Sequence, residues 1–88
     1  MGYTVTQFQS TPNPNAVKCI LDRPLPEPAR SFRKAEEAAA DPLGAALFSI
    51  PGITGVLLSG GWLTVNKSPD SDWPKIKKSV QDALSRAL

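Results

Sequence analysis

The 88-residue sequence has no histidine and only one cysteine, Cys19. Without histidine, the Ser-His-Asp and Cys-His arrangements of nucleophilic catalysis cannot form within this chain. A single cysteine forms no intrachain disulfide and no CxxC motif, and it cannot provide the set of thiolates that holds zinc or an iron–sulfur cluster. The glycines match neither the phosphate-binding loop nor the dinucleotide-binding fingerprint. These absences exclude the common catalytic and cofactor-binding classes, and we expect a protein that is not an enzyme.

Long apolar runs and concentrated charge are missing as well. No apolar stretch reaches about 18 residues, so we expect no membrane-spanning helix, and the N-terminal MGYTVTQFQS lacks the regions of a signal peptide, which predicts a cytoplasmic protein. The net charge is +2, and the basic residues are spread along the chain. Nucleic-acid binding needs a concentrated basic surface, so neither nucleic acid nor membrane is an expected partner. With 41% hydrophobic residues, the length predicts a single domain over residues 1–88.

Two strands are predicted near the N-terminus, at residues 3–8 (YTVTQF) and 16–22 (AVKCILD), because both segments are rich in β-branched and apolar residues. In the second strand, alternation places Cys19 on the core face and Lys18 on the opposite face. We therefore expect Cys19 to act as a small buried hydrophobe. Residues 23–30 (RPLPEPAR) contain three prolines. Because proline excludes a helix interior and a central strand, this segment predicts an extended surface connection.

Helical signals dominate the middle and the end of the chain. Residues 34–40 (KAEEAAA) have strong helix propensity, and the following Asp-Pro predicts a second short helix that Asp41 caps and that ends near Ser49. Gly44 lies inside that helix, where it costs up to about 1 kcal/mol. The last helix is predicted from Asp72 onward. Its apolar stripe contains Trp73, Ile76, Val80, Ala83, Leu84, Ala87 and Leu88.

The sequence ITGVLLSGGWLTVNK predicts a hairpin between strands at residues 53–58 and 62–67, with Gly60 and Gly61 supplying the positive φ values of a tight turn. The complete order is ββ-α(α)-ββ-α. It predicts an α+β fold in which a small antiparallel or mixed four-stranded sheet carries its helices on one face. A ferredoxin-like βαββαβ order is the alternative, although no segment is a candidate for its final strand.

The connection between the first two strands, QSTPNPNAVKC, is the richest motif in the chain. Its threonine and asparagine side chains can bond the local backbone, and its prolines fix two φ angles. A hairpin connection with an Asx-type turn would explain this composition without any function. The functional alternative is a rigid loop that presents its polar groups to a partner or an anion. The candidate partner-binding residues are Thr11, Pro12, Asn13, Pro14, Asn15 and Lys18.

Carboxylates offer a second type of candidate site, a weak iron-binding module with oxygen ligands such as Glu36, Asp41 or Asp70. Neighbouring Glu36 and Glu37 diverge by about 100° on a helix and make a poor metal pair. No ligand set is visible in the sequence, so we assign no metal-binding residue and no cofactor.

Several motifs together resemble the N-terminal domain of the Nfu/NifU-type iron–sulfur cluster scaffold proteins. They occur in the right order and cover almost the whole chain. These motifs are TPNPN-x-x-K at 11–18, EEA-x-x-x-PL at 36–43, LF-x-I-x-G-[IV] at 47–53, TV-x-K at 64–67 and Asp-Trp at 72–73. The chain departs from the family pattern at Cys19, where the family commonly has an aromatic residue, and at Trp62, where it usually has phenylalanine.

The resemblance implies a role in iron–sulfur cluster assembly. In that family, a second domain with a CxxC motif binds or transfers the cluster, and this sequence ends at Leu88 without one. The resemblance therefore implies a stand-alone, non-enzymatic accessory domain that acts through protein–protein contacts, with cluster-assembly proteins such as a separate CxxC scaffold as partners. Iron binding is implied at the level of the family only. The resemblance also strengthens the functional interpretation of the TPNPN loop.

Overall fold

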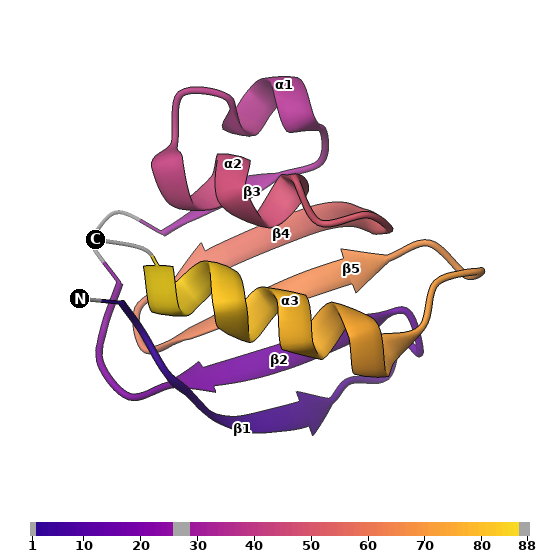
Figure 1. Ribbon diagram of the computed structural model, residues 1–88, viewed down its shortest axis with the longest axis horizontal. Helices are drawn as coiled ribbons and strands as arrows, with labels where there is room; N and C mark the ends of the chain where they lie inside the picture. Colours follow the sequence, from indigo (N-terminus) through magenta and orange to yellow (C-terminus); the bar gives the residue numbers. More distant parts are fainter. Residues whose placement is uncertain (1, 26–28, 87–88) are drawn as a thin grey trace.

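The computed structural model describes residues 2–25 and 29–86. Within these residues the chain forms five strands and three helices, shown in Figure 1. The elements are β1 (Val5–Ser10), β2 (Ala16–Leu21), β3 (Arg30–Phe32), α1 (Ala35–Ala38), α2 (Pro42–Phe48), β4 (Ile53–Ser59), β5 (Trp62–Lys67) and α3 (Trp73–Arg86). None of the described helices is long and apolar enough to cross a membrane.

The strands form one antiparallel sheet in the order β1-β2-β5-β4-β3. This confirms the predicted α+β fold with an antiparallel sheet and helices. The ferredoxin-like alternative would end in a strand, whereas the last described element is helix α3. The predicted number of strands was wrong, because the sheet has five strands instead of four. The additional strand, β3, has only three residues, too few to show an alternation in the sequence, and it forms by pairing with the edge of β4.

The connection before β3 is partly buried, whereas an extended surface connection was predicted. Leu25 exposes only 3% of its surface, and its amide donates to the carbonyl of Gly60 at 2.7 Å. This part of the connection therefore covers the end of the β4–β5 hairpin. Further along the predicted extended segment, residues 26–28 lie outside the described residues, and Arg30 begins strand β3 instead of belonging to the connection.

The core lies between the sheet and helices α2 and α3, and α3 crosses in front of β5 and β2 in Figure 1. Ile76, Val80 and Leu84 recur every four residues and form the buried stripe of α3, as predicted. Ala87 and Leu88, also assigned to this stripe, lie outside the described residues.

Cys19 is fully buried on the same core face, which confirms its assignment as a hydrophobe. Burial raises the pKa of the thiol to about 12, although Lys77 partly offsets this effect. Because the thiolate is the reactive form, Cys19 is unreactive at neutral pH.

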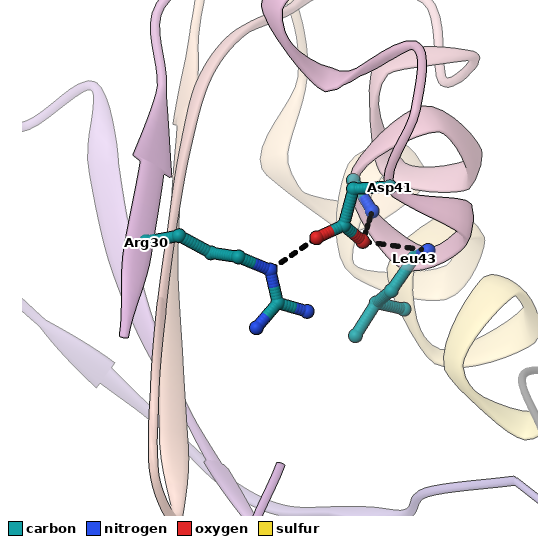
Figure 2. A network of polar contacts seen from close by, with 4 residues as sticks. Arg30, Asp41 and Leu43 are labelled. Atoms are coloured by element: carbon teal, nitrogen blue, oxygen red, sulfur yellow. Dashed lines mark hydrogen bonds and ion pairs between the residues drawn. The ribbon is translucent and has the colours of Figure 1, made fainter. Parts of the chain in front are cut away.

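Helix α2 begins as predicted. The Asp41 side chain accepts hydrogen bonds from the amides of Leu43 at 3.1 Å and Gly44 at 3.0 Å, and it forms an ion pair with Arg30 (Figure 2). Burial works against ionisation of this carboxyl, but the Arg30 guanidinium and the two amides outweigh burial, so the pKa of Asp41 lies below its ordinary value. The cap therefore connects α2 to strand β3, which was not visible in the sequence.

Packing explains the glycine at position 44, although glycine is a poor helix former. A Cβ atom at Gly44 would lie 3.0 Å from the Phe32 ring and 3.1 Å from the Cβ of Ala38. The missing side chain thus allows β3 and α1 to pack closely on α2. In the β4–β5 turn, by contrast, only Gly60 has a positive φ, 53°, so the prediction that Gly61 also needs one was wrong.

Candidate functional site

The connection between β1 and β2, called the 11–15 loop below, is closed by its own side chains. The Thr11 hydroxyl lies 2.8 Å from the carbonyl of Asn13 and 3.0 Å from that of Ala16, and it accepts a hydrogen bond from the Asn13 amide at 3.2 Å. The Asn13 side-chain oxygen accepts from the Asn15 amide at 2.9 Å. This last bond, from a side chain to an amide two residues later, is the Asx-type turn that the sequence predicts.

Two residues from distant parts of the chain fasten the loop from the side that faces the helices. The indole Nε1 of Trp73, the first residue of α3, donates to the carbonyl of Pro14 at 3.0 Å across 59 residues of sequence. The ammonium of Lys67, at the end of β5, donates to the side-chain oxygen of Asn15 at 3.2 Å, and the Lys67 amide donates to the Asn15 carbonyl at 2.8 Å. The loop is therefore attached to both the sheet and α3.

Lys67 is the residue that the sequence analysis missed. It exposes only 9% of its surface, and among the described residues no carboxylate forms an ion pair with it. Its ammonium is satisfied by Asn15, by the Ser68 carbonyl at 3.3 Å and by the Trp73 ring, whose centre lies 5.5 Å away. A buried charge is costly unless such groups surround it. The signal was present, because alternation places Lys67 on the same face as the core residue Val65.

The structure brings five of the six predicted site residues together in one loop. Pro12, Asn13 and Pro14 are exposed, whereas Thr11 and Asn15 are half-buried and hold the shape of the loop. The sixth residue, Lys18, lies on β2 and points to the sheet face without helices, where its ammonium is 4.6 Å from the centre of the Trp62 ring.

The backbone amides of the 11–15 loop are not arranged as an anion site. The amide hydrogens of Asn13, Asn15 and Ala16 are all bonded within the loop, and the two prolines have none. A backbone site for an anion needs several amide hydrogens that point outward. The exposed part of the loop instead consists of two proline rings and the side chain of Asn13.

The carboxylates considered for iron do not form a site. Asp41 is engaged at the start of α2, while Asp70 lies exposed on the β5–α3 connection, where hydrogen bonds from the Ser68 hydroxyl and its own amide lower its pKa. Glu36 belongs to the separate helix α1. Within residues 2–25 and 29–86, no group of three or more histidine, cysteine, aspartate or glutamate residues could hold a metal ion.

Comparison with known proteins gives a consistent result. The profile of the family described as "Scaffold protein Nfu/NifU N terminal" matches residues 6–88. The chain is 33% identical over 75 residues to NifU-like protein 5, mitochondrial, of Arabidopsis thaliana. The matched region covers 84% of this chain and 27% of that protein. The chain is also 33% identical over 99 residues to the human NFU1 iron-sulfur cluster scaffold homolog, mitochondrial, in a match that covers 98% of this chain and 36% of that protein.

A solved structure has the same fold. The solution structure of a NifU-like protein from Saccharomyces cerevisiae matches with a TM-score of 0.77 and 22% identity over 94% of this chain and 77% of that chain. The chain spans about a quarter to a third of the length of the two curated relatives, 27% and 36%. Motif order, sequence profile and fold agree. The chain therefore belongs to the family of Nfu/NifU scaffold N-terminal domains, which is associated with iron–sulfur cluster assembly.

Proposed function

We propose that this domain is a non-enzymatic accessory in iron–sulfur cluster assembly and that it binds partner proteins through the exposed side of the 11–15 loop. One observation supports this most. The loop is held from within by Trp73 and Lys67, while Pro12, Asn13 and Pro14 remain exposed. A loop that is already ordered loses little conformational entropy when a partner binds, which favours affinity.

The expected partner is a protein that carries the cluster ligands which this sequence lacks. The sequence has a single cysteine, and that cysteine is buried. A separate CxxC scaffold protein of the family would supply cluster-binding thiolates, and the domain would then act by positioning that scaffold. The proline rings offer rigid apolar contacts, and the side-chain Nδ2 of Asn13 offers a hydrogen-bond donor.

The test is the affinity of the purified domain for a CxxC scaffold protein of the same family, measured by calorimetry. Asn13→Asp preserves the Asx turn, because a carboxylate also accepts from the Asn15 amide, but it removes the amide donor and adds a negative charge. Gly61→Asp adds the same charge to the other hairpin, where a Cβ would meet nothing within 4 Å. We expect Asn13→Asp to weaken binding about tenfold or more and Gly61→Asp to leave it unchanged. Equal binding by both variants would remove the loop from the contact, and no binding by the native domain would reject the function.

A further inference from the structure

One face of the sheet carries none of the described helices. The residues at its centre are Lys18 and Ile20 on β2, Leu57 on β4, and Trp62 and Thr64 on β5, and we call this surface the open face. These side chains alternate with buried ones along each strand, so they point away from the core that lies beneath α3 (Figure 1).

Strand register gathers the open face into one patch. Ile20 lies opposite Trp62, and Thr64 lies opposite both Lys18 on one side and Leu57 on the other. Leu57 exposes 36% of its surface and is the exposed large hydrophobic residue of the described chain. Three apolar side chains from three neighbouring strands therefore share one surface with a single ammonium.

The charge on this face is unbalanced. None of the described strands contains aspartate or glutamate, because the described carboxylates lie in helices and connections. The other two basic residues of the strands face the helix side: Arg30 pairs with Asp41, and Lys67 is buried beneath the 11–15 loop. Lys18 is thus the one charged residue that the described strands place on the open face.

This imbalance restricts what can cover the open face. Lys18 would lose hydration on covering, and the cost is offset only if the partner brings a carboxylate. A second copy of the chain that used the same face would bring another lysine and no carboxylate. A nucleic acid would find one lysine and one tryptophan, too few for a phosphate-tracking, base-stacking surface. The complementary occupant is an acidic protein segment with apolar side chains.

The size of the face sets the strength of binding. Five strands about 4.8 Å apart, with six-residue strands rising about 3.3 Å per residue, give a surface of roughly 20 by 20 Å. Covering it would bury less than about 1,200 Å² in total, which is typical of transient complexes.

We infer that the open face is a transient docking site for an acidic, apolar segment of a partner protein, whose carboxylate pairs with Lys18 and whose apolar side chains cover Ile20, Leu57 and Trp62. The inference rests on the proposed function in taking the partner to be a protein. It adds a second contact surface to the 11–15 loop and specifies the chemistry that this surface recognises.

The two tryptophans make the test specific, because the indole of Trp62 belongs to the open face and the indole of Trp73 donates to the loop. The isotope-labelled chain is titrated with a short synthetic peptide in which glutamate alternates with leucine, and separately with its counterpart in which lysine replaces glutamate. We expect the acidic peptide to shift the Trp62 indole signal and leave the Trp73 signal in place. Lys18→Glu should weaken this binding about tenfold or more, whereas Lys78→Glu, the same charge change on exposed α3, should leave it intact.

Other outcomes overturn the inference. Equal shifts with the basic peptide would remove the charge argument, and shifts of Trp62 on simple dilution would show that a second copy occupies the face. A response to single-stranded oligouridylate but not to the acidic peptide would indicate nucleic acid. If neither peptide moves Trp62 while a CxxC scaffold protein still binds the native domain and not Asn13→Asp, the docking site is wrong and the proposed function stands.

Discussion

The two hairpin connections of this domain both reverse the chain between antiparallel strands, but they differ in length and in contacts. β4 and β5 are joined by Gly60 and Gly61 alone, and a Cβ atom at either position would meet nothing within 4 Å. β1 and β2 are joined by the 11–15 loop, which contains two prolines and is bonded to the side chains of residues 59 and 52 positions away, whereas the carbonyls of the glycine turn accept from the backbone amides of Leu25 and Leu21. Since two residues suffice to reverse a strand here, the additional structure of the 11–15 loop needs another explanation than chain reversal. We take that explanation to be partner binding.

The largest expected effect comes from separating the 11–15 loop from the buried charge beneath it. Asn15→Ala leaves the Lys67 ammonium without its side-chain acceptor in a site that is 9% exposed. We expect a loss of about 2–3 kcal/mol in the free energy of unfolding, measured by urea denaturation. Asn13→Ala, the matched change at the exposed tip, removes only the Asx turn and should cost about 1 kcal/mol or less. Equal losses would mean that Lys67 does not depend on the loop.

The β4–β5 turn consists of two glycines, so substitutions there should act through backbone conformation. Gly60 has a positive φ of 53°, whereas Gly61 does not. Gly60→Ala should therefore cost about 1–2 kcal/mol, and Gly61→Ala should be neutral or stabilise by up to about 1 kcal/mol because it restricts the unfolded chain. Urea midpoints of the two variants decide this, and a destabilising Gly61→Ala would contradict the expectation that Gly61 is free of backbone strain.

A smaller effect is expected from loosening the loop without disturbing the core. Trp73→Phe keeps an aromatic ring but removes the indole hydrogen bond to the Pro14 carbonyl. We expect a loss of about 0.5–1.5 kcal/mol in unfolding free energy. Amide signals should change in the 11–15 loop and stay in place around Gly60. If signals of both hairpins moved alike, the bond would not be specific to the loop.

Acid should weaken the Asp41 cap at the start of α2 and leave the 11–15 loop unchanged. The pKa of Asp41 is lowered from 3.8 in the folded state, so its stabilising contribution is present above that value and is lost as the pH falls below about 4. Because the Asp41–Arg30 pair is partly exposed, the loss should stay under about 1 kcal/mol. Asp41→Asn keeps a capping side chain and should abolish this part of the pH dependence of the urea midpoint. The 11–15 loop has no titratable side chain, and a matching acid response of its amide signals would contradict the comparison.

Local patterns predicted most of the fold, and long-range contacts account for what they missed. Alternation and helical periodicity located β2, the β4–β5 hairpin, the Asp41 cap and the buried stripe of α3. The short strand β3 exists through its pairing with β4. Glycine at position 44 is explained by the ring of Phe32, which comes from another element. Neither relation leaves a periodic signal in the sequence.

The candidate site shows the same division. Composition and resemblance located the 11–15 loop and its Asx turn, which depend on neighbouring residues. They did not reveal that Lys67 and Trp73 fasten it, because these residues come from β5 and α3. They also grouped Lys18 with the loop, whereas the strand places it on the open face against Trp62.

The most direct test of the central claim is the map of amide and indole chemical shifts when the isotope-labelled domain is titrated with a CxxC scaffold protein of the family. The account predicts that the signals of Thr11, Asn13 and Asn15 and the indole of Trp73 move together, while those of Gly60 and Gly61 do not. Shifts confined to the glycine turn, or no shifts at all, would contradict the assignment of the 11–15 loop as the partner-binding surface.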